Sequence, residues 1–149
     1  MDDCTFTDLT ATNGAGLSSY ASQLTLLRTN FTNCVAGPTL IPDPTFDLTE
    51  RTLPASVGGA GGALLAEAGG PLVLSGCGFD GCRAWVGGAL ALFNTSVASL
   101  VNASLTNNLA DFGGGALFAL SDWYGGALVP RVQGPRWRGG LVTGGGLRG

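Results

Sequence analysis

The sequence contains no histidine and no lysine, and it has one isoleucine and one methionine among its 149 residues. Without histidine, the chain cannot form a Ser-His-Asp or Cys-His catalytic site, and no imidazole can bind a metal. Without lysine, it cannot form a Schiff base with a substrate, and it lacks the lysine of a phosphate-binding Walker loop. These absences exclude several large classes of enzyme.

Charged side chains are also scarce, because the chain holds only seven arginines and ten acidic residues, for a net charge of −3. Residues 1–122 contain all ten acids and three arginines, which gives −7. Residues 123–149 contain four arginines and no acid, which gives +4. Since the main part is acidic and would repel phosphates, we expect no nucleic-acid partner.

Neither a targeting segment nor a membrane span is expected in this chain. The first four residues, Met1 to Cys4, are acidic, whereas a signal peptide needs a basic start followed by an apolar run. The longest uncharged stretch, Ala84 to Ala110, is interrupted by asparagine and serine residues. Polar residues at that density argue against a transmembrane segment.

Glycine is abundant, with 26 residues, but it lacks the strict period of three that a collagen triple helix needs. Instead, the sequence repeats itself. Four segments each begin with a large apolar residue and carry an alanine five positions later: Phe6–Ala11, Phe31–Ala36, Phe79–Ala84 and Leu105–Ala110. A glycine-rich block follows each of them: Gly14–Leu17, Gly61–Ala66, Gly87–Leu90 and Gly113–Leu117.

The spacing of these segments is close to 25 residues. Phe6 and Phe31 are 25 apart, and Phe79 and Leu105 are 26 apart, whereas Phe31 and Phe79 are 48 apart because the segment 37–57 is inserted. Apolar residues alternate with period two, which is typical of strands and not of helical repeats. A period near 25 with short strands predicts a parallel β-helix, here with three strands per repeat joined by Gly and Asn turns. Equivalent residues then stack over one another.

The glycine blocks Gly87–Leu90 and Gly114–Leu117, with the anchor segments, resemble the repeats of chlamydial polymorphic outer-membrane proteins. They also resemble the broader pectate-lyase-like superfamily of right-handed β-helices. The resemblance covers about residues 4–120, although the family's FxxN pattern keeps its asparagine only at Asn108. It implies a surface-exposed or secreted β-helix, often adhesive, and brings no catalytic residue with it.

We therefore expect an all-β fold, a right-handed parallel β-helix of about four coils, over residues 1–122, with a Pro-rich insertion loop at 37–57. Residues 123–149 are expected to form a partial coil and a disordered Gly/Arg-rich tail. The interior is expected to consist of Phe6, Phe31, Leu72, Leu74, Phe79, Leu90, Leu92, Leu105 and Leu117.

Four cysteines, Cys4, Cys34, Cys77 and Cys82, allow three pairings. Cys34 and Cys82 occupy the same position of their repeats, so they are the candidate disulfide. The alternatives are buried free thiols or a metal site, although a zinc site would need further ligands. No metal or other cofactor is expected.

Three N-glycosylation sequons begin at Asn30, Asn94 and Asn102. They favour a secretory history, but asparagine and threonine are also common turn and strand-surface residues.

In the insertion, Asp43, Asp47 and Glu50 offer oxygen ligands for calcium. The simpler interpretation of this segment is a solvated, proline-stiffened loop.

In the tail, residues 136–140 faintly resemble an arginine-glycine RNA-binding segment. The alternative interpretations are a disordered tail or an imperfect end of the coding sequence.

No catalytic residue is assigned, because Asp8, Asp80 and Asp111 occupy different positions of their repeats and Arg83 is expected to be a solvent-facing turn residue. The sequence favours a non-catalytic extracellular or cell-surface module of a larger protein, used for adhesion, glycan contact or wall scaffold. The expected partners are further β-helix coils of a larger chain, glycans or cell-surface proteins. The alternative is a relative of polysaccharide lyases or hydrolases.

Overall fold

The computed structural model describes residues 1–37, 59–68, 70–94, 98–120, 131–133 and 141–144. In these residues the chain forms strands and no helix, so the all-β expectation is confirmed. The strands build four sheets, named here in the order in which the chain first reaches them. The first contains β1 (Thr5–Thr7), β5 (Asn30–Thr32), β9 (Gly78–Asp80) and β13 (Ser104–Thr106). The second contains β2 (Thr10–Ala11), β6 (Val35–Ala36), β10 (Arg83–Val86) and β14 (Leu109–Gly113).

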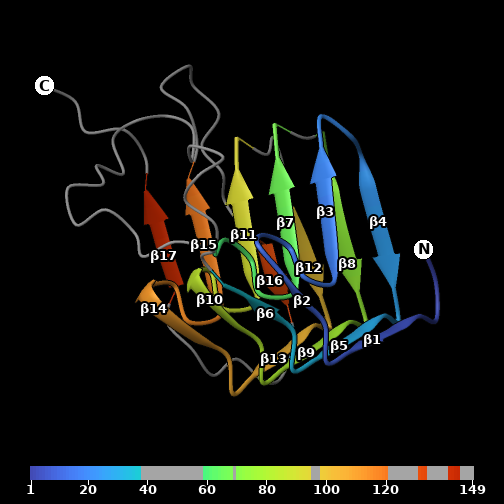
Figure 1. The fold of residues 1–149 in the computed structure, drawn as a ribbon. Helices are drawn as coiled ribbons and strands as arrows, with labels where there is room; N and C mark the ends of the chain where they lie inside the picture. Colours follow the sequence, from blue (N-terminus) through green and yellow to red (C-terminus); the bar gives the residue numbers. More distant parts are fainter. Residues whose placement is uncertain (38–58, 69, 95–97, 121–130, 134–140, 145–149) are drawn as a thin grey trace, which may run out of the picture.

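The remaining strands form the third and fourth sheets. The third contains β3 (Leu17–Tyr20), β7 (Leu64–Glu67), β11 (Leu90–Phe93), β15 (Leu117–Leu120) and β17 (Leu141–Gly144). The fourth contains β4 (Leu24–Leu27), β8 (Leu72–Ser75), β12 (Ala98–Val101) and β16 (Arg131–Gln133). Figure 1 shows the third sheet with its arrows side by side, from β3 to β17.

All pairings between neighbouring strands in the described residues are parallel, and from β1 to β16 the chain visits the four sheets in the same order before it returns to the first. We call four consecutive strands, one from each sheet, a repeat. This path is compatible with a parallel β-helix. However, each repeat contains four strands, so the expectation of three was wrong. The anchor segment divides into two strands because Asp8, and Asn33 in the next repeat, adopt a left-handed conformation with φ of 54° and 53°.

The predicted stacking of equivalent residues is confirmed by the register. Phe6 pairs with Phe31, Phe31 with Phe79, and Phe79 with Leu105. The Phe6 and Phe31 rings stack with centroids 4.8 Å apart, close to the spacing between paired strands. Because equivalent residues stack on one another, the inward-facing apolar side chains of each repeat pack against those of the next repeat.

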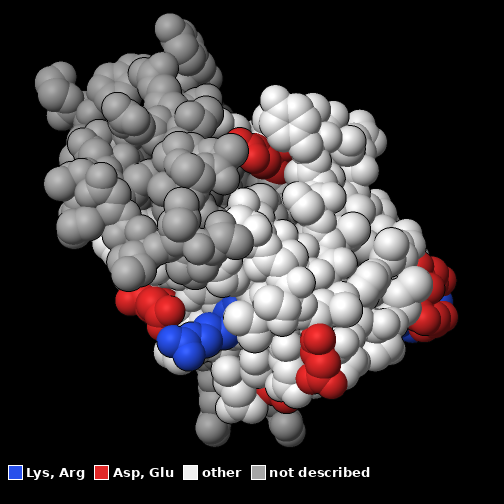
Figure 2. All heavy atoms as spheres, in the orientation of Figure 1, with Lys and Arg blue, Asp and Glu red and all other residues white. Residues whose placement is uncertain are grey.

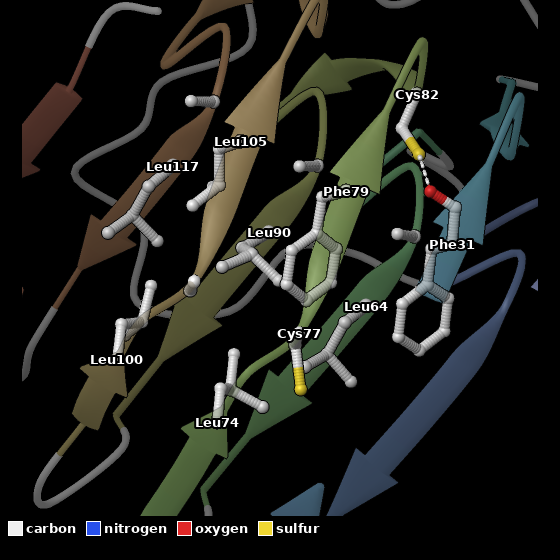
Figure 3. Close-up of a cluster of buried hydrophobic side chains, with 14 of the residues drawn as sticks. Phe31, Leu64, Leu74, Cys77, Phe79, Cys82, Leu90, Leu100, Leu105 and Leu117 are labelled. Atoms are coloured by element: carbon white, nitrogen blue, oxygen red, sulfur yellow. Dashed lines mark hydrogen bonds between the residues drawn. The ribbon is translucent and has the colours of Figure 1, made fainter. Parts of the chain in front are cut away.

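The expected interior is largely confirmed, since all of its residues except Phe6 are buried. Phe6 is half-buried because β1 is the end strand of its sheet, so only one neighbour covers its ring. Figure 3 shows Phe31, Phe79 and Leu105 following one another along this interior. A second apolar cluster was not expected from the sequence: Ala60, Leu65, Val86, Ala91, Phe93 and Phe118.

The corners between strands are made by residues with positive φ, which recur at equivalent positions. One corner uses glycine throughout, at Gly14, Gly61, Gly87 and Gly114. The others accept other residues: Asp3, Arg28, Gly76 and Asn102 at one, Asp8, Asn33, Gly81 and Asn107 at another, and Ala21, Ala68 and Asn94 at the last. The expectation of Gly and Asn turns is therefore right in kind, although alanine and arginine also occupy such positions.

Residues 123–149 were expected to form a partial coil and a disordered Gly/Arg-rich tail. Within them, Arg131–Gln133 and Leu141–Gly144 form β16 and β17, which pair in parallel with β12 and β15. The other residues of 123–149, including the arginine-glycine segment 136–140, lie outside the described residues, as do residues 38–58 of the insertion. In the part of the chain that the structure describes, no helix is long and apolar enough to cross a membrane.

Candidate functional site

Cys34 and Cys82 lie side by side in neighbouring repeats. The residues that follow them, Val35 and Arg83, are paired in register, and the Arg83 amide donates to the Cys34 carbonyl over 2.9 Å. Both cysteines are fully buried and both are free thiols. Figure 3 shows the Cys82 sulfur directed at the Phe31 carbonyl, to which it donates over 3.8 Å.

The environment of these thiols suppresses their ionisation. Burial raises the pKa of Cys82 to about 12, and it also raises the pKa of Cys34. The two thiols interact with each other, as expected for equivalent positions of adjacent repeats. Neutral thiols in an apolar interior pack as small hydrophobic groups and are weak nucleophiles.

The other two cysteines occupy a different position of the repeat. Cys77 is buried, and its sulfur donates to the Leu26 carbonyl over 3.5 Å, whereas Cys4 is half-buried. Thr29 is the equivalent residue of the repeat that lies between them: the Asn30 amide donates to the Cys4 carbonyl, and the Gly78 amide donates to the Thr29 carbonyl. Cys4 and Cys77 are therefore two repeats apart. Within the described residues, no group of three or more Cys, Asp or Glu side chains is arranged to hold a metal ion.

The three carboxylates considered as catalytic candidates have different partners. Asp8 accepts a hydrogen bond from Asn33, and Asp80 accepts from Thr106 and Asn107. Asp111 forms an ion pair with Arg83 at 2.8 Å. They follow or belong to different strands, so the structure keeps these acids in separate contacts, as the differing positions in the repeats predicted.

Arg83 was expected to be a turn residue, but it begins β10 and its exposed side chain lies against Asp111 of β14. Next to this ion pair, Trp85 and Phe112 pack with ring centroids 5.0 Å apart and planes tilted by 39°. Leu109 and Phe112 are 53% and 54% exposed, which is high for large apolar side chains. We call Arg83, Trp85, Leu109, Asp111 and Phe112 the β10–β14 patch.

The β10–β14 patch was missed by the sequence analysis, although one signal of it was present. Ala84 precedes the corner glycine Gly87 by three residues, whereas Ala110 precedes Gly114 by four. The additional residue produces a shift in the register between β10 and β14. Such a bulge re-aims neighbouring side chains. Here Asp111 and Phe112 occupy the longer stretch and meet Arg83 and Trp85.

Elsewhere, the described surface carries few charges. Figure 2 shows a few small groups of charged side chains that are separated by wide areas of uncharged surface. Arg28 pairs with Asp2 at 2.6 Å and with Asp3 at 2.8 Å. The hydrogen bond from the Arg28 guanidinium lowers the pKa of the Asp3 carboxyl. These groups are exposed, so we assign them a modest role in tying the first residues of the chain to the second repeat.

The sequon asparagines differ in exposure. Asn30 on β5 and Asn102 at a corner are exposed, while Asn94 is half-buried and is followed by residues outside the described part of the chain. The structure thus leaves two of the acceptor side chains accessible, and their glycosylation stays a prediction. The calcium candidates Asp43, Asp47 and Glu50 lie outside the described residues.

A comparison of the chain with protein-family models, with curated proteins and with solved structures finds no match.

Proposed function

We propose that this chain is a non-catalytic, extracellular or cell-surface repeat module whose strands form a right-handed parallel β-helix of about four coils. The parallel register and the stacked interior favour this proposal, because a stack of ordered repeats makes a stiff support for surface contacts. The function then resides in the exposed side chains that the support positions, rather than in a buried pocket.

The observation that carries the proposal is the β10–β14 patch. It combines an exposed aromatic ring, Phe112, with the neighbouring Trp85 ring and with the Arg83–Asp111 ion pair. Large aromatic side chains and arginine are the residues that contribute most to binding when partners cover them. An aromatic face can pack on the C–H face of a sugar ring while arginine and carboxylate groups bind its hydroxyls. We infer that this patch contacts a glycan, in line with an adhesive role.

A second contact is expected at the first repeat. Its inward residues Phe6, Leu17 and Leu24 are only half-buried, whereas Phe31, Leu64 and Leu72 at the equivalent positions are buried. The strands of this repeat, β1 to β4, are the end strands of their sheets. Unpaired strand edges next to half-covered apolar residues favour the addition of further strands. Further β-helix coils are therefore the proposed partner at this end.

The glycan contact can be tested by binding the protein to immobilised neutral and acidic oligosaccharides, with wild type, Phe112→Ala and Arg83→Ala compared. Tyr20→Ala is the matched control, because Tyr20 is a 70% exposed aromatic residue on β3, away from the patch. We expect binding of the wild type and the control, with a loss of about tenfold in affinity for the two patch variants.

Absence of binding to all of these glycans, or equal loss in Tyr20→Ala and Phe112→Ala, would contradict the proposal. The same samples distinguish the alternative. If a bound polysaccharide is shortened, with new reducing ends or unsaturated products, and if Asp111→Asn stops this reaction, then the chain is a lyase or hydrolase relative.

A further inference from the structure

The placement of Cys34 and Cys82 determines which cysteines can be joined. Because Val35 and Arg83 are paired in register, Cys34 and Cys82 face each other across neighbouring parallel chain segments. Such segments are about 4.8 Å apart. Disulfides have Cα separations of roughly 4.4–6.8 Å, so this pair lies inside the required window.

The orientation of the two side chains is equivalent as well. Cys34 donates to the carbonyls of Phe6 and Thr32, and Cys82 donates to those of Phe31 and Asp80. In each case one acceptor lies two residues earlier and the other lies in the preceding repeat. Both sulfurs therefore point into the same buried interior, where they interact with each other.

The other pairings are excluded by geometry. Cys4 and Cys77 are separated by the repeat that contains Thr29, so their distance is about two strand spacings, well beyond the limit of about 7 Å. Each of the four remaining pairs joins Cys4 or Cys77, which precede a strand of the first sheet, to Cys34 or Cys82, which follow one. The three extended residues of such a strand hold these pairs roughly 10 Å or more apart. Cys34 and Cys82 are thus the one favourable pair among the four cysteines.

We propose that Cys34 and Cys82 form a disulfide when the chain folds under oxidising conditions, which joins the repeat that contains the insertion to the repeat after it. With glutathione disulfide as the oxidant, one cysteine thiolate attacks it and releases one glutathione thiolate, leaving a mixed disulfide. The second cysteine thiolate then attacks the protein sulfur and releases another glutathione thiolate. The two protons lost by the cysteines go to the two glutathiones, so two thiols are oxidised and one disulfide is reduced.

The disulfide requires only a small movement of the chain, and it forms during folding rather than in the folded protein. The Cβ atoms must approach to about 4 Å, which is shorter than the strand spacing by less than about 1 Å. Since both thiols are buried and hard to ionise in the folded chain, the exchange proceeds during folding, when small reagents can reach them. This inference does not rest on the proposed glycan contact. It concerns a covalent link that can be measured whether or not a glycan binds.

The arginine positions allow a direct test by tryptic digestion without reductant. Cleavage after arginine places Cys4 in peptide 1–28, Cys34 in peptide 29–51, and Cys77 with Cys82 in peptide 52–83. The full chain is refolded from denaturant in a mixture of reduced and oxidised glutathione, and the remaining thiols are alkylated. After digestion, the masses of the peptides are measured by mass spectrometry. We expect peptides 29–51 and 52–83 joined, with Cys77 alkylated, so that the mass lies two hydrogens below the sum of peptide 29–51 and the singly alkylated peptide 52–83. Peptide 1–28 should be alkylated and unjoined.

Cysteine-to-alanine variants identify the partners, with matched controls in the same chain. Cys34→Ala and Cys82→Ala should abolish the joined peptide, whereas Cys4→Ala and Cys77→Ala should leave it unchanged. The proposal is overturned if the refolded wild type yields only separate, alkylated peptides, or if the joined peptide persists in Cys82→Ala and disappears in Cys77→Ala. The alanine variants are checked for a β-type circular dichroism spectrum. If one of them does not fold, the joined wild-type peptide is digested further with chymotrypsin, because cleavage after Phe79 separates Cys77 from Cys82. A bond from Cys34 to Cys77 in that digest would overturn the proposal.

Discussion

Phe31 stacks on Phe79 with ring centroids 5.1 Å apart and planes within 3° of parallel, although the two residues are 48 positions apart in the sequence. The insertion that separates them therefore leaves the register of the two repeats intact. Phe31 also stacks on Phe6, so both faces of its ring are covered, and it is fully buried. Its neighbour Phe6 has only one covered face.

This difference predicts unequal costs of truncation. Phe31→Ala should lower the free energy of unfolding by about 3–5 kcal/mol, because it removes a fully buried ring and leaves a cavity. Phe6→Ala should cost about 1–2 kcal/mol, since part of that ring is already exposed to water. Urea denaturation, monitored by circular dichroism, measures the free energy of unfolding of both variants. Equal losses would contradict the role of Phe31 as a doubly covered member of the stack.

Gly88, the second glycine of the block Gly87–Leu90, leaves no space for a side chain. A Cβ added to Gly88 would overlap the Gly115 carbonyl oxygen and lie 2.5 Å from that of Leu109. Because these contacts are to backbone atoms of the neighbouring repeat, relief requires the repeats to separate. Gly88→Ala should therefore destabilise the protein by about 3 kcal/mol.

Gly37→Ala is the control for this substitution, since a Cβ there would have nothing within 4 Å. It should change stability by less than about 0.5 kcal/mol in the same denaturation experiment. If both alanine variants are as stable as the wild type, the close approach of the repeats at Gly88 is not a constraint on the sequence.

Alanine at a left-handed corner is a local conflict that a single substitution should relieve. Ala68 is exposed and has φ of 50°, a conformation that costs an L-residue about 1–2 kcal/mol and costs glycine very little. Ala68→Gly should raise the free energy of unfolding by about 0.5 kcal/mol after the greater chain entropy of glycine is counted. Ser18→Gly, at an exposed position inside β3, should instead lower it.

Much of this fold was predictable because the interior repeats like residues at like positions. The two sets of equivalent residues that begin with Phe6 and Ala11 predicted the pairing of equivalent strands, since stacked repeats must match their apolar faces. The fourth strand of each repeat was hidden because β2 and β6 have only two residues, too few for a period to be recognised. The corner at Asp8 separates β2 from the anchor strand without a glycine to mark it.

The candidate site was less predictable, because it arises where the repeat is broken. Arg83 and Asp111 do not occupy equivalent positions, and they meet through the register shift between β10 and β14. The apolar residues Leu65, Phe93 and Phe118 were also missed. Period two assigns these residues to the solvent-facing side of their strands, but they are buried, so alternation cannot identify them.

The buried thiols predict how stability depends on alkaline pH. The pKa of Cys82 is raised from 9.0 to about 12 in the folded chain because burial disfavours the thiolate. The unfolded chain therefore loses this proton first. The corresponding stability is present in full below pH 9 and is lost as the pH rises from 9 towards 12. With reductant present, the urea midpoint of the wild type should fall across this range. Cys82→Ala should fall less steeply, and identical slopes would contradict ionisation of this thiol on unfolding.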